Sequence, residues 1–184
     1  MPDVDREAAV GAIRSRVRND GTDVILLDGP SGAGKSTLAD ALVAAWAGPV
    51  ELALVRMDDI YPGWSGLAAA GEHVHDHLLV PRSQDGQARW QRHDWVRDAP
   101  AEWHSVPNTV PVLIEGCGVL TRANAPLASL TVWLDADDAL RKERALARDA
   151  GAFDAHWEEW DAQFVRFVKQ EDPLSSAKLV LRST

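Results

Sequence analysis

Short apolar runs alternate along the chain with longer segments in which apolar residues recur every three or four positions. The runs lie at 23–29, 50–57, 110–116, 127–135 and 177–183. Each has the length and continuity of a buried parallel strand. The segments with helical spacing lie at 5–18, 35–48, 137–149 and 153–170. This alternation predicts an α/β fold in which a five-stranded parallel sheet is covered by helices on both faces.

The helical segment at 153–170 has the clearest apolar face. Its aromatic residues follow at spacings of 4, 3, 4 and 3: Phe153, Trp157, Trp160, Phe164 and Phe167. A continuous apolar stripe of this kind packs against a core. We therefore expect the last three tryptophans of the chain, Trp133, Trp157 and Trp160, to be core residues.

Polar residues and a glycine stand at the ends of four predicted strands. They are Gly29, Asp58, Glu115 and Asp135. In open parallel sheets, ligands bind outside the carboxyl ends of the strands. We therefore expect a functional site at this edge of the sheet.

The segment 62–109 is the least regular part of the chain, and it is rich in glycine, proline and histidine. Within it, 88–95 and 101–106 predict the two strands of a hairpin, separated by VRDAP at 96–100. No internal repeat, low-complexity tract or domain linker interrupts the sequence. We expect the 184 residues to form one domain, long enough to bury a core.

Charge and cysteine content narrow the possible partners. The net charge is -9, which argues against duplex nucleic acid because phosphate backbones require clustered Lys and Arg. Cys117 is the only cysteine, so no intrachain disulfide can form, and we expect a reducing cytoplasm. The acidic N-terminus does not resemble a signal peptide, and polar residues interrupt the most apolar stretch, 39–55, so we expect no membrane partner.

GPSGAGKST at 29–37 has the pattern of a phosphate-binding loop, G-x-x-x-x-G-K-[ST]. The pattern is met by Gly29, Gly34, Lys35 and Ser36. Glycines let backbone amides surround a phosphate at the positive end of the following helix, and Ser31, Gly32, Ala33 and Thr37 complete this loop. We expect Lys35 to reach the β- and γ-phosphates of ATP and the Ser36 hydroxyl to ligate Mg²⁺. A strand before the loop and an amphipathic helix after it strengthen this interpretation.

The loop predicts binding of a nucleoside triphosphate without saying what becomes of it. Guanine-nucleotide switches carry an Asn-Lys-x-Asp motif, and this chain has no Asn-Lys pair. Motor and helicase ATPases need more machinery than 184 residues provide. Small phosphotransferases fit the length best.

Four further segments resemble, in the same order, the uridine kinase family of P-loop nucleoside kinases. They are DDIY at 58–61, HDW at 93–95, VLIEG at 112–116 and LDADDALRKERALARD at 134–149. The resemblance implies a P-loop NTPase three-layer fold. It also implies an acceptor-binding insertion at about 62–109, which contains the hairpin, and a short lid at about 137–158. The activity that it implies is transfer of the γ-phosphate of ATP to a sugar hydroxyl of a nucleoside.

The resemblance also implies roles for individual residues. Asp58 is implied as the base that orients and deprotonates the acceptor hydroxyl, as carboxylates do in other kinases. Holding Mg²⁺ with Ser36 and Glu115, or capping a helix, are alternative roles for it. Further acceptor contacts are implied for Tyr61, His93, Asp94, Trp95 and Glu115.

Three arginines share one face of the predicted helix at 137–149: Arg141, Arg144 and Arg148. The first two coincide with lid arginines of the family, which neutralise charge that develops during transfer. Arg148 is a weaker candidate for a phosphate contact. The alternative is a solvated face on which the arginines pair with nearby carboxylates such as Asp137 and Asp138.

The chain departs from the family in ways that concern the acceptor. His93 and Trp95 replace a Tyr and a Phe of the family's hairpin, and Asp98 stands where a His is expected. AGAFDAHWEEW at 150–160 replaces an Arg-Gly-Arg lid stretch, and HVHDHLLVP at 73–81 replaces a His-Pro-Asp element. Uridine or cytidine is therefore not a secure prediction. A kinase for a nucleotide or another small metabolite, or a non-enzymatic ATP-binding module, stays open, as does a homo-oligomer.

Several residues of the middle segment could contact a ligand. Trp64, Trp90, Trp95 and Trp103 could bind an acceptor by their ring faces or could simply pack. Four arginines could serve a phosphorylated acceptor: Arg82, Arg89, Arg92 and Arg97. His73, His75 and His77 make a transition-metal site conceivable, although no further ligand pattern supports one.

Overall fold

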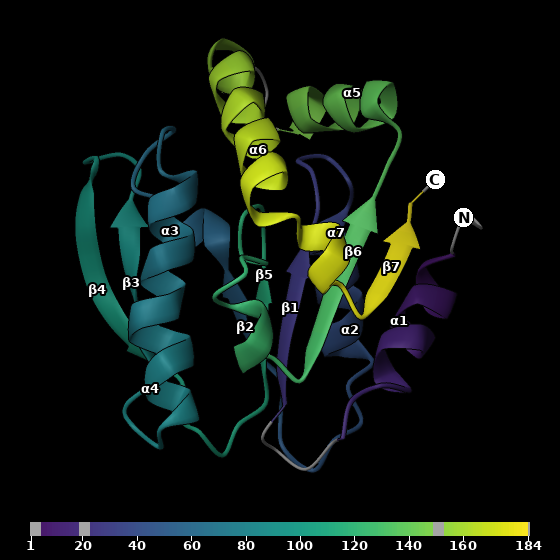
Figure 1. The fold of residues 1–184 in the computed structure, drawn as a ribbon, viewed down its shortest axis with the longest axis vertical. Helices are drawn as coiled ribbons and strands as arrows, with labels where there is room; N and C mark the ends of the chain where they lie inside the picture. The colour runs from purple at the N-terminus through teal and green to yellow at the C-terminus, as the bar shows by residue number, and fades with distance from the viewer. Residues whose placement is uncertain (1–4, 19–22, 149–152, 184) are drawn as a thin grey trace.

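The computed structural model describes residues 5–18, 23–148 and 153–183, and its core is a parallel sheet (Figure 1). The strands are β1 (Val24–Asp28), β2 (Ala53–Arg56), β5 (Val112–Glu115), β6 (Leu130–Asp135) and β7 (Leu179–Arg182). They run side by side in the order β2-β5-β1-β6-β7, and every neighbouring pair is parallel. The α/β fold with a five-stranded parallel sheet is therefore confirmed.

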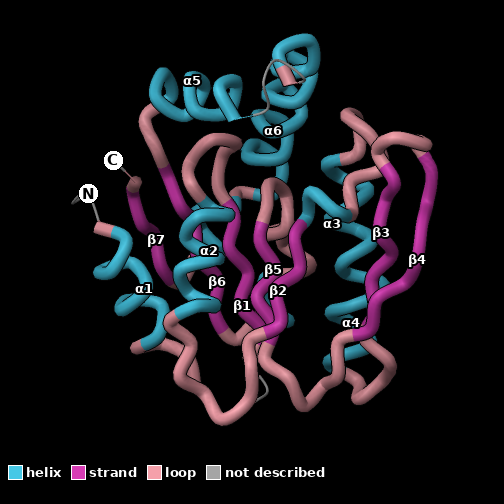
Figure 2. Tube along the Cα trace, turned by 180° about the vertical axis from the view of Figure 1, so that it is seen from behind, coloured by secondary structure: helices cyan, strands magenta, loops and turns pink. Residues whose placement is uncertain are grey.

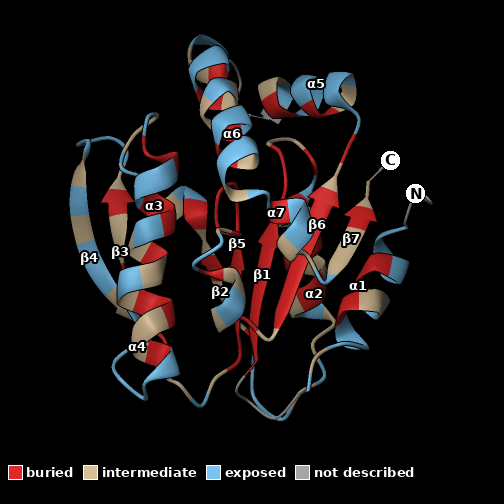
Figure 3. Cartoon of the chain, viewed as in Figure 1, coloured by how far each residue is buried: buried red, intermediate tan, exposed pale blue. Residues whose placement is uncertain are grey.

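Helices form a layer on each face of the sheet. Helices α1 (Arg6–Arg14) and α2 (Lys35–Ala44) cover one face (Figure 2), whereas α3 (Leu67–Val74), α6 (Trp157–Glu171) and α7 (Pro173–Ser176) lie on the other. Alternate residues of β1 serve the two layers: Ile25 and Leu27 belong to the cluster with α1 and α2, and Leu26 belongs to the cluster with α3 and α6. The central strands are buried along their whole length, as parallel strands with helices on both faces require (Figure 3).

Helix α5 (Asp138–Arg148) crosses beyond the carboxyl ends of the strands, beside the outer end of α6 (Figure 1). A 3₁₀ turn at Asp154–His156 leads into α6. Another 3₁₀ turn, Ala125–Leu127, precedes β6. In the part of the chain that the structure describes, no helix is both long and apolar enough to cross a membrane.

The middle segment is more regular than the sequence suggests. Helix α3 continues through a π-helical turn, His75–Leu79, into α4 (Val80–Ser83). The expectation of an irregular segment is therefore wrong over 67–83. Pro81 lies at the start of α4, where a proline can be accommodated, yet a proline inside a helical pattern is normally read as its end. Such π-helical turns occur inside α-helices and leave no sequence signal of their own.

The predicted hairpin is present, with a shorter turn than expected. Strands β3 (Arg89–Asp94) and β4 (Ala99–Ser105) pair antiparallel as a separate two-stranded sheet, so Ala99 and Pro100 belong to the second strand instead of the turn. Proline is tolerated there because neither strand has a further neighbour in the sheet. On the helical side, the backbone N–H of Gln91 donates to Nε2 of His73 over 3.0 Å.

Arg82 joins the helical segment to the chain that enters β5. Its side chain is buried, and its guanidinium donates to three backbone carbonyls: those of Pro107 at 3.0 Å, Asn108 at 3.2 Å and Val110 at 2.6 Å. Burial lowers the pKa of this guanidinium. A charged donor with several carbonyl partners stabilises a segment more than a single neutral hydrogen bond does. Arg82 therefore has a structural role.

We predict that Arg82→Met lowers the free energy of unfolding by about 2–4 kcal/mol, because three carbonyls lose a charged donor. Urea unfolding monitored by circular dichroism measures this loss. Arg97→Met is the matched control, because the Arg97 side chain is 83% exposed, and we expect it to change stability by less than about 0.5 kcal/mol. Equal stability of the two variants would contradict the anchoring role.

Candidate active site

The loop between β1 and α2 is held in its path by glycines. Gly32 and Gly34 have φ values of 81° and 94°, in the left-handed region that side chains disfavour, and Gly34 directly precedes α2. A Cβ atom on Gly29 would collide with the carbonyl oxygen of Leu134, and one on Gly32 would collide with that of Arg141. The loop backbone therefore packs closely against the end of β6 and the first turn of α5.

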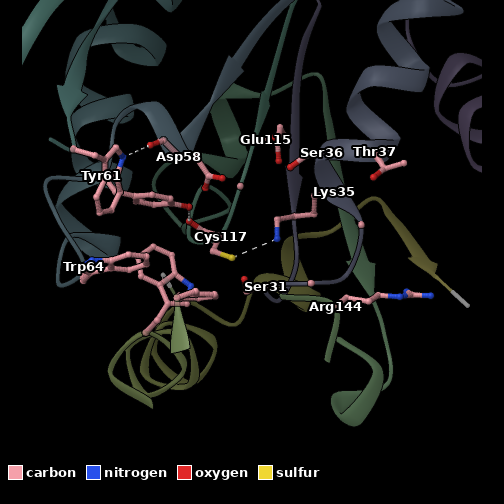
Figure 4. A pocket seen from close by; sticks show the side chains of 16 residues that line it. Ser31, Lys35, Ser36, Thr37, Asp58, Tyr61, Trp64, Glu115, Cys117 and Arg144 are labelled. Atoms are coloured by element: carbon pink, nitrogen blue, oxygen red, sulfur yellow. Dashed lines mark hydrogen bonds between the residues drawn. The ribbon is translucent and has the colours of Figure 1, made fainter. Parts of the chain in front are cut away.

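The Lys35 side chain is folded onto this loop. Its ammonium donates to the carbonyls of Gly29 at 2.8 Å and Pro30 at 2.9 Å, and it lies 3.3 Å from Sγ of Cys117 (Figure 4). Burial works to lower the pKa of Lys35, but the neighbouring Cys117 and acidic side chains outweigh it and raise the pKa. The ammonium therefore keeps its charge where an anion would enter the loop.

Asp28 fixes the start of the loop and was not singled out from the sequence. Its carboxylate is completely buried and accepts backbone N–H groups from Gly29 at 2.6 Å, Gly118 at 3.1 Å and Leu120 at 2.7 Å. Burial raises the pKa of Asp28 to about 6, against the opposing effects of these N–H groups and of Lys35. The only sequence signal for it is an acidic residue at the end of a fully apolar run.

Two carboxylates face the loop from neighbouring strands. Asp58 lies in a 3₁₀ turn, Met57–Asp59, directly after β2 and is exposed to the cavity. Glu115 is the last residue of β5 and is buried. Burial raises its pKa, while Lys35 and a hydrogen bond with the Ser36 side chain act to lower it.

Arg56, the last residue of β2, pairs with Glu115. Its guanidinium donates to Oε1 of Glu115 over 2.9 Å and also pairs with Asp40 of α2. The carboxylate of Glu115 is therefore oriented by a neighbour on β2, and its position relative to the loop does not depend on a bound ligand.

Lys35, Asp58 and Glu115 line one cavity of about 590 Å³. Most of the candidate residues from the sequence line it: Ser31, Gly32, Gly34, Lys35, Ser36, Thr37, Asp58, Tyr61, Trp95, Glu115 and Arg144. In Figure 4, Asp58 and Trp64 lie on one side of Lys35, and Thr37 and Arg144 lie on the other. The cavity thus has a loop side, which includes Lys35, and an opposite side.

The two candidate arginines of α5 differ in position. Arg144 lines the cavity. Arg141, one turn earlier, donates instead to Asp138 at 2.7 Å and to Asp161 of α6 at 3.0 Å, and its guanidinium lies 5.5 Å from the ring centre of Trp157. The structure does not bring Arg141 to the cavity, and its contacts brace α5 against α6. The side chain of Arg148 falls outside the described residues.

Two candidate residues of the hairpin, His93 and Asp94, contact other hairpin residues instead of the cavity. His93 is buried, and its Nε2 lies 3.1 Å from Oδ1 of Asp98, the residue at which the sequence departs from the uridine kinase pattern. Asp94 accepts the backbone N–H groups of Val96 and Arg97 and so shapes the hairpin turn. Neither His93 nor Asp94 is among the described residues that line the cavity.

An aromatic wall, which we define as Tyr61, Trp64, Trp95, Phe153 and Trp160, closes the side of the cavity away from the loop. Trp160 is buried, as expected of a core residue, yet its ring also faces the cavity. The sequence could not predict that Trp160 lines the cavity, because an apolar stripe on a helix does not indicate which of its residues border a binding site.

The remaining tryptophans of the middle segment pack elsewhere. Trp90 is buried and stacks on His104, with the ring centres 4.4 Å apart. Trp103 lies against His73 and His77 on the helical side of the hairpin. The ligand interpretation of the middle tryptophans therefore holds geometrically only for Trp64 and Trp95.

The histidines show no metal-site geometry. His73 accepts the N–H of Gln91, and Nδ1 of His75 lies 2.9 Å from Oδ1 of Asn124. Within the described ranges, no group of three or more His, Cys, Asp or Glu side chains is arranged to hold a metal ion.

A second cavity, of about 1040 Å³, meets the first along Gly34, Thr37 and Arg144. Its other walls are the start of α1, at Asp5–Glu7, and the end of β7 with the residue after it, 181–183. Ala33, a loop candidate, lines this second cavity. The loop at 29–37 therefore borders two cavities, of which only the first is lined by Asp58 and the aromatic wall.

The chain matches no protein-family model and no curated protein. Solved structures do match it in fold. A Bacillus stearothermophilus protein described as a possible uridine kinase aligns with a TM-score of 0.67 and 19% identity over 96% of each chain. A protein from Silicibacter sp. TM1040, provisionally described as a fructose transport system kinase, aligns with a TM-score of 0.58 and 19% identity over 96% of this chain and 98% of that chain. At this identity the likeness shows only that the chain shares its fold with these two proteins.

We predict that Asp28 makes stability fall as the pH rises from 4 to 6. The pKa of its carboxyl is raised from 3.8 to about 6 by burial, so the native state binds this proton more tightly than the unfolded state does. Linkage then favours folding at pH 4 and removes that contribution as the pH passes 6, by about 2–3 kcal/mol.

Urea unfolding of the wild type and of Asp28→Asn between pH 4 and 7 measures this effect. The difference in unfolding free energy isolates Asp28, because other titrating groups such as Glu115 are common to both proteins. A difference that does not change with pH would show that the carboxyl titrates alike in the folded and unfolded chains.

Proposed function

We propose that this protein is an ATP-dependent phosphotransferase that moves the γ-phosphate to a hydroxyl group of a small molecule. The observation that carries the proposal is the position of Asp58, which lines the same cavity as Lys35 and Ser36 but projects from the end of another strand. A carboxylate facing a phosphate loop across an open cavity can orient a hydroxyl for in-line attack. The kinase descriptions of both structural neighbours support this assignment.

The two cavities suit the two ends of the donor nucleotide. Phosphates fit the loop, where backbone N–H groups at the start of α2 and the ammonium of Lys35 provide positive charge. We place the nucleoside half of ATP in the second cavity, at the start of α1 and the end of β7. Arg144 lines both cavities and can neutralise charge between them.

Oxygen ligands near the loop fit Mg²⁺. The Ser36 hydroxyl and the carboxylates of Glu115 and Asp58 line one cavity, and hard oxygen donors are the ligands that Mg²⁺ prefers. We propose that these residues hold the ion, directly or through water. When bound, Mg²⁺ would neutralise charge on the phosphate oxygens.

In the proposed reaction, Asp58 accepts the proton of the acceptor hydroxyl. The hydroxyl oxygen forms a bond to the γ-phosphorus as the bond from that phosphorus to the β–γ bridging oxygen breaks, and ADP leaves. Lys35 exchanges the carbonyls of Gly29 and Pro30 for phosphate oxygens, which a mobile ammonium can do without moving the loop. The aromatic wall excludes water that would otherwise hydrolyse ATP.

The cavity favours an unphosphorylated acceptor. Arg92 donates to both carboxylate oxygens of Glu102, Arg82 is tied to backbone carbonyls, and Arg89 lies over the ring of Trp103. None of these arginines is among the described residues that line the cavity, and the same holds for Arg97. A nucleotide acceptor would therefore find few cations, whereas a nucleoside, which the sequence resemblance implies, needs none.

We predict that Asp58→Asn lowers kcat by about 10²–10⁴-fold while sparing ATP binding, because the amide keeps the shape of the side chain but cannot take a proton. ADP release from Mg·ATP across a panel of nucleosides, nucleoside monophosphates and hydroxylated metabolites measures turnover, and calorimetry measures ATP affinity.

Lys35→Ala provides the reference for loss of the phosphate site, and we expect it to abolish transfer and weaken ATP binding together. If Asp58→Asn loses ATP affinity as severely as turnover, Asp58 is not the base. Tight ATP binding with no acceptor-dependent ADP release, in a wild type that Asp58→Asn does not alter, would favour a regulatory ATP-binding module.

We further predict that Arg144 and Arg141 separate into a catalytic and a structural arginine. Arg144→Gln should lower kcat by about 100-fold or more, because the cavity loses a cation that faces developing phosphate charge. Arg141→Gln should instead lower the unfolding temperature relative to the wild type, because it breaks the contacts to Asp138 and Asp161. Steady-state kinetics and thermal unfolding of both variants test this, and the reverse assignment of effects would overturn it.

A further inference from the structure

We infer that the cavity selects its acceptor by stacking on an apolar ring that the acceptor carries. The ligand class is therefore an alcohol with an uncharged ring that has few polar edge atoms. The inference deepens the proposed function and rests on it, because only a phosphotransferase would use this ligand as a phosphate acceptor. It arises from the aromatic wall, whose five rings occupy the place opposite the phosphate loop.

The rings come from three parts of the chain that are distant in sequence. Tyr61 and Trp64 follow β2, Trp95 stands at the tip of the hairpin, and Phe153 and Trp160 belong to the segment that follows α5. They pack on one another: the ring centres of Tyr61 and Trp160 are 4.7 Å apart, and those of Trp64 and Trp95 are 5.0 Å apart. Such contacts fix the rings and present a rigid apolar surface to the cavity.

The neighbours of Trp64 tie this surface to the segment before α6. Trp64 stacks on Phe153, with the ring centres 5.3 Å apart and the planes 17° apart, and on His156 at 4.4 Å and 8°. Gln163 of α6 donates to the carbonyl of Trp64 over 2.8 Å. The wall is therefore preorganised, so a ligand would not have to order it on binding.

Two of the polar groups on these rings are already engaged. The hydroxyl of Tyr61 donates to the carbonyl of Cys117 over 2.8 Å, and Nε1 of Trp95 donates to the carbonyl of Asp58 over 2.8 Å. The indole N–H groups of Trp64 and Trp160 are the wall's remaining donors. As side-chain acceptors, the five rings offer only the oxygen of Tyr61, a residue that is 2% exposed.

Charged and amide groups are scarce on this side. Among the described lining residues, those outside the phosphate loop, the strand end at 115–117 and Arg144 are the five wall residues and Asp58. Asp58 is assigned to the reacting hydroxyl. The N3–H of uracil or the amino group of cytosine would therefore meet no dedicated side-chain acceptor.

The energetic consequence favours an apolar ring over a pyrimidine. A buried polar group without a partner costs about 1–3 kcal/mol, whereas apolar area removed from water gains about 25 cal/mol per Å². A ring without polar edge atoms keeps the stacking area and avoids the cost. One such group corresponds to roughly a tenfold change in affinity.

The test compares uridine with its phenyl C-riboside, in which a benzene ring replaces the uracil on the same ribose. Calorimetry with a non-hydrolysable ATP analogue and Mg²⁺ measures binding without turnover. We expect the phenyl riboside to bind at least about tenfold more tightly than uridine. We also expect Trp95→Ala to weaken phenyl riboside binding by at least about tenfold, because it removes a face of the wall.

Trp103→Ala is the matched control, because Trp103 lies on the same hairpin but contacts His73 and His77 outside the cavity. We expect it to leave both affinities unchanged, and Trp95→Phe to restore most of the loss in Trp95→Ala. Circular dichroism verifies that each variant is folded.

Uridine binding as tightly as the phenyl riboside, or more tightly, would overturn the inference, as would an equal loss in Trp103→Ala and Trp95→Ala. ADP release with the same two ribosides tests the proposed function separately. If uridine binds more tightly than the phenyl riboside and also supports ADP release, the proposed transferase activity is supported and the ring-face inference is refuted. Preferred binding of the phenyl riboside without ADP release from either compound would refute the transferase and leave the ligand preference in place.

Discussion

A completely buried carboxylate, Asp28, holds the site together. It accepts N–H groups from the first loop residue and from Gly118 and Leu120, which follow β5. The end of β1, the phosphate loop and the segment carrying Cys117 are therefore fixed relative to one another. Burial raises the pKa of Asp28 to about 6, so the native state bears an electrostatic cost at neutral pH. The three N–H groups and Lys35 reduce that cost, and in return the acidic surroundings keep Lys35 charged.

The cavity built around this carboxylate has two kinds of surface. Backbone amides, Lys35 and Arg144 gather on the loop side, whereas rings and Asp58 form the other side. Arg141 contributes indirectly, because its bonds to Asp138 and Asp161 set how α5 lies against α6. That packing brings both Arg144 and Trp160 to the same cavity from different helices. The charged side chains and the aromatic rings thus lie on different sides of the cavity, although the positions of Arg144 and Trp160 both depend on the contact between α5 and α6.

Local patterns in the sequence predicted much of this architecture. Continuous apolar runs indicated the strands of the sheet, and the glycines of 29–34 indicated a loop in which Cβ atoms at Gly29 and Gly32 would collide with neighbouring backbone. The helix at 67–83 was not predicted, because Pro81 within it is typical of a helix end and the π-helical turn at His75–Leu79 has no sequence pattern of its own. Asp28 was missed because burial of a carboxylate depends on N–H groups about 90 residues away in sequence.

Helix phase explains the arginines and Trp160. Arg141 and Arg144 share a helix face in sequence, yet only Arg144 reaches the cavity. Arg141 is instead held by Asp161 and Trp157 of a later helix. Trp160 belongs to a core stripe, yet it also lines the cavity together with Phe153 at the start of that stripe. Both outcomes depend on tertiary packing, which periodicity does not encode.

One departure from the uridine kinase pattern connects the two surfaces of the cavity. Where that family has an Arg-Gly-Arg lid stretch, this chain has AGAFDAHWEEW at 150–160. In the described part of that stretch, Phe153 and Trp160 line the cavity and His156 stacks behind Trp64. Ring faces therefore lie where the family has basic side chains, and in the proposed function Lys35 and Arg144 would neutralise the phosphates. A segment that supplies ring faces improves the fit for an apolar ligand and lowers the positive charge available to a second phosphate. This one stretch of sequence supports both proposals, that the acceptor is unphosphorylated and that the cavity selects it by stacking on a ring.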